Sequence, residues 1–95
     1  MTIRILRPDD SRVRQLAGAI LIDVRADHER ALGMAEGARG IVREELERDP
    51  ARHLPQADAD ALLVCQRGAR SLKAAEALQA AGYTNLVSVE GGTEA

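Results

Sequence analysis

The single cysteine of this chain, Cys65, stands between an apolar run and a polar segment that contains a glycine. Residues 61–64 read Ala-Leu-Leu-Val, and residues 65–71 read Cys-Gln-Arg-Gly-Ala-Arg-Ser. Backbone N–H groups in a tight turn and in the first turn of a helix attract negative charge, and nearby arginines lower the pKa of a thiol. The spacing therefore predicts a cysteine thiolate inside a ring of amides, an arrangement suited to covalent nucleophilic chemistry.

The residues after Cys65 suit the roles that such a loop requires. Gly68 lets the backbone adopt a positive φ, and Arg70 can present a planar guanidinium to an anionic group above the sulfur. Ser71 is expected to cap the following helix rather than to transfer protons, whereas Arg67 is compatible with either a substrate contact or a solvent-facing position. The predicted substrate-binding residues are Gln66, Arg67, Gly68, Ala69, Arg70 and Ser71.

The elements that hold this loop alternate between strands and helices. Apolar runs predict strands at residues 3–6, 19–22, 38–42, 61–65 and 86–89. Capping residues and spacing predict a helix from residue 9 or 10 to about 18, a short helical turn after residue 27, a polar surface helix at 43–49 and a helix at 71–81. Residues 50–60 hold two prolines and are expected to form a loop. The alternation predicts an α/β fold with a central, mostly parallel five-stranded sheet flanked by helices.

A second polar pair follows the apolar run at residues 19–22. Asp23 and Arg25 come directly after this run, and the loops at the carboxyl ends of parallel strands meet at one edge of the sheet. A carboxylate at a strand end most often accepts hydrogen bonds from loop amides or pairs with an arginine. We therefore expect Asp23 and Arg25 to brace the site from behind rather than to react.

Composition excludes several other classes of protein. A net charge of −2 and a pI near 5.6 argue against a general nucleic-acid binder, and no apolar run approaches the ~20 residues of a membrane span. One cysteine allows no intramolecular disulfide, which favours a reducing compartment such as the cytoplasm. His28 and His53 lack the spacing of metal ligands, so we expect no metal, and we expect no organic cofactor either.

The segment from Cys65 to Ser71 resembles the active-site loop of single-domain rhodaneses, in which a cysteine is followed five positions later by arginine and then by serine or threonine. Three flanking segments resemble the same family in the same order. They are Leu-Ile-Asp-Val-Arg at 21–25, Ala-Ala-Glu-Ala-Leu at 74–78 followed by Ala-Gly-Tyr-Thr-Asn-Leu at 81–86, and Val-Glu-Gly-Gly at 89–92. The resemblance covers the chain from about residue 20 to its end and implies one rhodanese-like domain over residues 1–95.

Two departures accompany the resemblance. Where the family often has Gly-His-Ile-Pro-Gly-Ala, this chain has Gly-Met-Ala-Glu-Gly-Ala at residues 33–38, so the shape of that loop is expected to differ. The family usually continues beyond the Gly-Gly turn into an aromatic segment and a last helix, whereas this sequence ends at Ala95. We therefore expect the sequence to be either part of a longer protein or a domain with a trimmed C-terminus.

The resemblance implies a sulfurtransferase that carries sulfur as a persulfide on Cys65. The donor would be thiosulfate or a protein persulfide, and the acceptor a thiol, cyanide or a sulfur-carrier protein. The Cys65 loop and the variant at residues 34–38 are similar to those of rhodanese domains fused to adenylyltransferases that activate sulfur carriers. Such an enzyme would then be a fused or separate partner. Arg67, Arg70 and Lys73 place positive charge around the cysteine, and this charge would attract an acidic carrier.

Two other functions belong to different classes. Some rhodanese domains are binding modules without activity, but these usually lack the cysteine that this chain retains. Phosphatases and arsenate reductases on the same fold are the second alternative. The related cell-cycle phosphatases have a loop one residue longer, whereas four residues separate Cys65 from Arg70 here. The shorter loop favours sulfur over phosphate.

Overall fold

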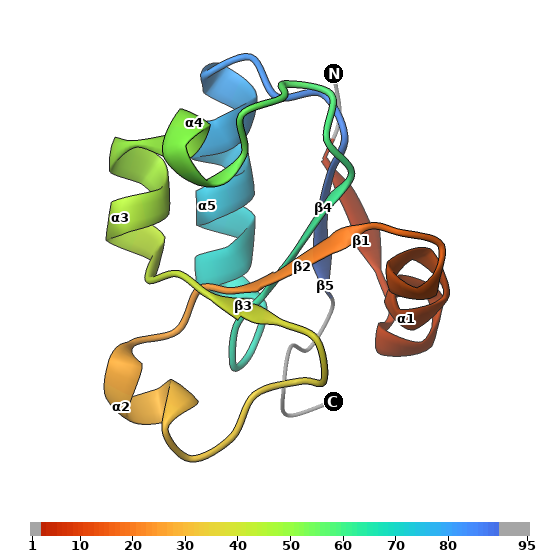
Figure 1. Cartoon of the computed structure of the whole chain (residues 1–95), viewed down its shortest axis with the longest axis vertical. Helices are drawn as coiled ribbons and strands as arrows, with labels where there is room; N and C mark the ends of the chain where they lie inside the picture. The colour runs from red at the N-terminus through yellow and green to blue at the C-terminus, as the bar shows by residue number, and fades with distance from the viewer. Residues whose placement is uncertain (1–2, 90–95) are drawn as a thin grey trace.

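The computed structural model describes residues 3–89 of the 95-residue chain, and these residues form a sheet with helices on both faces (Figure 1). The strands are β1 (Arg4–Leu6), β2 (Ile20–Asp23), β3 (Arg39–Gly40), β4 (Ala61–Val64) and β5 (Leu86–Val89). Their order in the sheet is β1-β5-β4-β2-β3, and each described pairing is parallel. The predicted α/β class and five-stranded sheet are confirmed.

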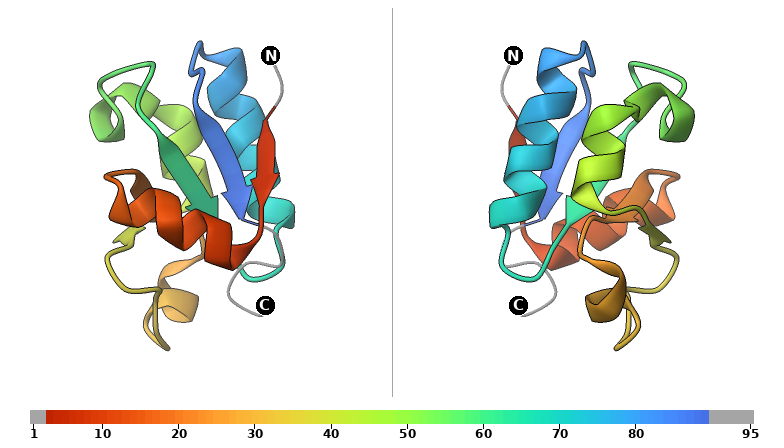
Figure 2. Two further views of the ribbon diagram at one scale, coloured as in Figure 1. Left: turned by 90° about the vertical axis from the view of Figure 1, so that its right-hand side faces the viewer. Right: turned by 90° about the vertical axis from the view of Figure 1, so that its left-hand side faces the viewer.

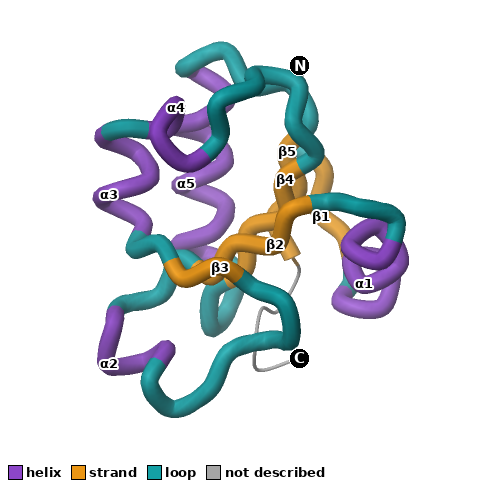
Figure 3. Tube along the Cα trace, viewed as in Figure 1, coloured by secondary structure: helices purple, strands orange, loops and turns teal. Residues whose placement is uncertain are grey.

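Helices cover the two faces of the sheet unequally. They are α1 (Pro8–Leu16), α2 (Asp27–Arg30), α3 (Arg43–Arg48), α4 (Pro50–His53) and α5 (Ala69–Ala80). Helix α1 lies on one face, while α3 and α5 lie on the other, as the two views of Figure 2 show. The short helix α2 lies beyond the carboxyl ends of the strands, followed by the loop at residues 31–38 (Figure 3). The edge with the predicted site is thus bordered by α2 and by the start of α5.

Alternation along the central strands divides the core into two layers, because successive side chains of a strand point to opposite faces. Leu21, Leu62 and Val87 pack in the layer beneath α1. Ile22 and Leu63 pack in the larger layer with the buried residues of α3 and α5. Cys65 belongs to this larger layer, so its side chain lies on the side of α5.

Two expectations about the segment from residue 43 to residue 60 were wrong. The segment expected to be a loop contains α4, which begins at Pro50, a residue that suits the first helical position because its φ is already close to the helical value. The helix expected to be polar and solvated, α3, has a fully buried Leu46. Leu54, which follows α4, is also fully buried, and its carbonyl accepts a hydrogen bond from the Tyr83 hydroxyl. Both segments therefore contribute to the core beside α5.

Within residues 3–89, no helix has the length and apolar character needed to cross a membrane.

Candidate active site

Cys65 directly follows β4 and begins the loop that connects this strand to α5. The residue before the helix is Gly68, whose φ of 96° lies in the left-handed region that glycine adopts readily. This turn brings the start of α5 back toward the sulfur within three residues. Cys65 is only 1% exposed, yet it lines a small surface hollow with Gln66, Arg67, Ala69 and Arg70.

Hydrogen bonds converge on the sulfur of Cys65. The Gly68 amide donates to Sγ over 2.9 Å, and the Ser71 hydroxyl oxygen lies 3.5 Å from Sγ. Burial by itself raises the pKa of the Cys65 thiol. The hydrogen bond with the Ser71 hydroxyl and those with the backbone amides of the loop outweigh burial, so that the pKa is lowered from its ordinary value. The structure thus agrees with the lowered pKa expected from the sequence.

Ser71 is not the helix cap that the sequence suggested. Helix α5 begins at Ala69, two residues earlier than expected, and Ser71 therefore lies inside its first turn. Its side chain is fully buried, with Oγ donating to the Gly68 carbonyl over 3.0 Å and lying 2.8 Å from Oγ of Ser88. Ser88, on β5, was not identified from the sequence, although a hydroxyl within the apolar run at 86–89 was the available signal.

Arg70 pairs with a carboxylate that the sequence analysis also did not identify. Its Nη1 and Nη2 donate to Oε1 and Oε2 of Glu29 over 2.6 and 2.7 Å. This bidentate contact lowers the pKa of Glu29 to about 2. Glu29 lies on α2 at the carboxyl edge of the sheet, so the ion pair links α2 to the start of α5. The Arg70 side chain nevertheless remains 38% exposed.

Asp23 and Arg25 form a buried ion pair behind the loop. Arg25 Nη2 donates to Oδ2 of Asp23 over 2.8 Å, and both Nε and the backbone amide of Arg25 donate to Oδ1 over 3.0 Å. The hydrogen bond with Asp23 raises the pKa of Arg25. Arg25 Nη2 also donates to the Gly33 carbonyl over 2.5 Å. The pair thus connects the end of β2 to the loop after α2, and its bracing role stays a prediction.

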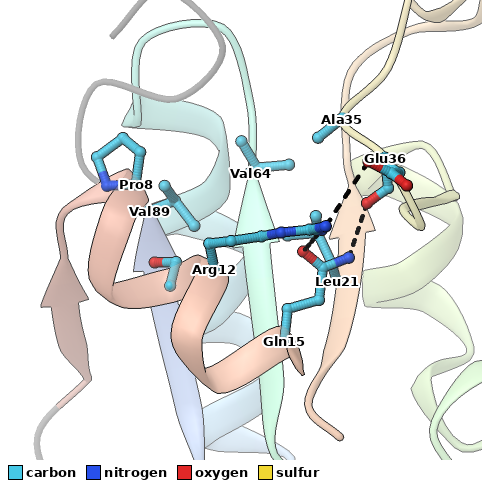
Figure 4. A pocket seen from close by; sticks show the side chains of 9 residues that line it. Pro8, Arg12, Gln15, Leu21, Ala35, Glu36, Val64 and Val89 are labelled. Atoms are coloured by element: carbon cyan, nitrogen blue, oxygen red, sulfur yellow. Dashed lines mark hydrogen bonds and ion pairs between the residues drawn. The ribbon is translucent and has the colours of Figure 1, made fainter. Parts of the chain in front are cut away.

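A larger cavity lies on the other side of the sheet, beneath α1. It has a volume of about 330 Å³ and is lined by apolar residues of β2, β4 and β5 (Figure 4). Its polar rim includes Gln15, whose amide donates to the Glu36 carbonyl over 2.8 Å, and Arg12, which pairs with the Glu36 carboxylate. The sulfur of Cys65 lies in the opposite core layer, so the candidate active site is the smaller hollow. In the described part of the chain, no group of three or more metal-ligating side chains gathers.

Comparisons with known proteins agree with this fold. A model of the rhodanese-like domain family matches residues 9–95. Thiosulfate sulfurtransferase GlpE of Pseudomonas entomophila is 31% identical over 91 residues, which cover 94% of this chain and 80% of that protein.

Solved structures give the same result. A rhodanese-like domain protein from Staphylococcus aureus has a TM-score of 0.80 at 29% identity, covering 98% of this chain and 90% of the other. The human single-domain sulfurtransferase TSTD1 has a TM-score of 0.79 at 27% identity, covering 96% and 91% of the two chains. This chain therefore belongs to the rhodanese-like domain family and is an enzyme of the rhodanese sulfurtransferase type.

Proposed function

We propose that the enzyme carries sulfur as a persulfide on Cys65 and that thiosulfate or a protein persulfide supplies it. The Cys65 thiolate attacks the outer sulfur of thiosulfate, a new S–S bond forms, and the original S–S bond breaks as sulfite leaves with the bonding electron pair. The observation that carries this proposal is the position of Sγ, which accepts a hydrogen bond from the Gly68 amide over 2.9 Å. The same loop of amides would hold the persulfide anion after the transfer.

The second half of the reaction requires a nucleophilic acceptor from outside the chain. Cys65 is the only cysteine, so no second thiol of this chain can resolve the persulfide. The acceptor, such as cyanide or a thiol, attacks the outer sulfur and releases the Cys65 thiolate with its electron pair. Two half-reactions on one nucleophile give ping-pong kinetics, and a reducing compartment such as the cytoplasm suits a single free thiol.

A sulfur-carrier protein is the acceptor that the charges around the site favour. Arg67 and Arg70 line the hollow around Cys65, and Lys73 lies one helical turn further along α5. Glu29 offsets part of this charge through its ion pair with Arg70. The remaining positive charge would steer an acidic carrier, activated by a fused or separate adenylyltransferase, toward the sulfur.

The experiment that tests the proposed function is intact-mass analysis after treatment with thiosulfate. We expect the mass to rise by one sulfur atom and to return to its original value when cyanide is added, with thiocyanate as the product. An aryl phosphate offered to the same enzyme is the matched alternative substrate, and we expect no turnover of it. Hydrolysis of the phosphate without a sulfur adduct would reject the sulfurtransferase and support a phosphatase.

Arg70 is proposed to bind the anionic part of the donor. The guanidinium has five N–H bonds, and a donor can use those not engaged by Glu29 or displace the carboxylate. Arg70→Lys keeps the positive charge but loses the planar guanidinium that can donate two parallel hydrogen bonds. We expect the KM for thiosulfate to rise about tenfold, the value of one lost charge-assisted hydrogen bond, with a smaller change in kcat.

The control for this substitution is Arg48→Lys, at an exposed arginine at the end of α3. Steady-state kinetics of both variants, together with their thermal unfolding, separate donor binding from the loss of the Glu29 pair. An unchanged KM in Arg70→Lys would show that Arg70 serves only to link α2 to α5.

A further inference from the structure

Ser88 places a hydroxyl inside the apolar sheet, next to Ser71, which contacts the sulfur of Cys65. It lies on β5 between Val87 and Val89, is 2% exposed, and its Oγ lies 2.8 Å from Oγ of Ser71. A buried hydroxyl costs free energy unless it is hydrogen-bonded. The contact with Ser71 satisfies this requirement and connects β5 to the first turn of α5.

The Ser71 hydroxyl lies near three polar atoms, but it has only one proton to donate in a hydrogen bond. Its Oγ lies 3.0 Å from the Gly68 carbonyl, 2.8 Å from the Ser88 hydroxyl and 3.5 Å from the Cys65 sulfur. The carbonyl and a thiolate can only accept hydrogen bonds, whereas a serine hydroxyl can donate or accept. The proton of Ser71 therefore points to the Gly68 carbonyl, to the Ser88 hydroxyl or to the sulfur at any one time.

The arrangement of protons must change when Cys65 ionises. While the thiol is protonated, its S–H can donate to Ser71, and Ser71 can donate to the Gly68 carbonyl. Once the thiolate forms, the sulfur needs a donor, and Ser71 can rotate its proton toward Sγ. If the Ser88 hydroxyl donates to Ser71 Oγ, Ser71 cannot donate to Ser88, and its O–H bond becomes more polarised and a stronger donor to the sulfur.

We propose that Ser88 is a positioning residue that acts through Ser71 to stabilise the Cys65 thiolate. The chain of contacts runs from Ser88 on β5 to Ser71 on α5 and then to the sulfur after β4. Ser88 does not touch the reacting atoms in this scheme. The inference deepens the proposed function, because the thiolate it stabilises is the species proposed to attack the sulfur donor.

The test is the pH dependence of Cys65 alkylation by iodoacetamide in the intact chain. The wild-type midpoint should lie below the ~8.5 of an unperturbed cysteine. Ser88→Ala removes the hydroxyl and should raise the midpoint by roughly 0.5 pH unit, and Ser71→Ala should raise it further because it removes the direct contact. The double variant should match Ser71→Ala, since Ser88 acts only through Ser71.

Two controls separate this effect from a change in packing. Ser11→Ala removes another buried serine hydroxyl, which lines the cavity beneath α1, and should leave the midpoint unchanged. Ser88→Thr keeps the hydroxyl and should keep the wild-type midpoint even if added bulk lowers the thermal stability.

Three outcomes would overturn the proposal. They are an unchanged midpoint in Ser88→Ala, an equal shift in Ser88→Ala and Ser88→Thr, and a Ser88→Ala shift that persists in the Ser71→Ala background. Alkylation requires no sulfur transfer, so failure of the proposed function would appear separately, as a missing sulfur adduct after thiosulfate treatment.

Discussion

Replacing Cys65 with serine is expected to abolish sulfur transfer from thiosulfate to cyanide. A serine hydroxyl is not ionised at neutral pH and forms no S–S bond, so neither half of the covalent cycle can proceed. We expect a loss of at least about a thousandfold in thiocyanate formation, comparable to the removal of a nucleophile in other covalent enzymes. The intact mass of the variant should also stay unchanged after thiosulfate treatment.

The fold of the Cys65→Ser variant should survive, which makes the loss interpretable. Serine is slightly smaller than cysteine, and its oxygen can still accept the hydrogen bond that the Gly68 amide donates to Sγ in the wild type. Thermal unfolding of the two proteins provides the control. Sulfur transfer that persists in a folded Cys65→Ser variant would refute the assignment of Cys65 as the sulfur carrier.

Replacing Asp23 with asparagine is expected to cost the largest amount of folding free energy among the substitutions at this site. Asp23 is fully buried and the side chain of Arg25 is only 10% exposed, so the substitution leaves a guanidinium without its counter-charge in the interior. Breaking one partner of a buried ion pair costs roughly 3–5 kcal/mol. Chemical denaturation at neutral pH measures this loss directly.

The matched control is Asp60→Asn, which breaks the ion pair of Asp60 with Arg14. That pair has a similar N–O distance of 2.7 Å, but its side chains are 39% and 28% exposed. Partly exposed pairs contribute about 0–1 kcal/mol, so Asp60→Asn should change the free energy of unfolding by much less. Equal, small losses in both variants would contradict the bracing role of Asp23 and Arg25.

Loss of the Asp23–Arg25 ion pair should also slow the reaction at Cys65. Arg25 donates a hydrogen bond to the Gly33 carbonyl over 2.5 Å and also pairs with Asp23. These contacts connect the loop after α2 to the end of β2. Under conditions where Asp23→Asn remains folded, we therefore expect slower formation of the Cys65 persulfide.

The sequence by itself determined the strands and turns that depend on residues adjacent in the chain. Apolar runs identified the central strands, because strands buried on both faces have nearly continuous apolar sequences. The expectation that Gly68 adopts a positive φ was also correct, since its φ is 96°. The position of Cys65 at the end of β4 and at the start of a helix-forming segment followed from the same local pattern.

Tertiary structure decided the partners of the polar side chains and which face of a polar helix is buried. The Glu29–Arg70 pair joins residues 41 positions apart, and the contact between Ser71 and Ser88 joins residues 17 positions apart. Local spacing carries no information about such pairs, because they depend on how α2, α5 and β5 pack at one edge of the sheet. The same reason applies to Leu46, which is buried because α3 packs beside α5.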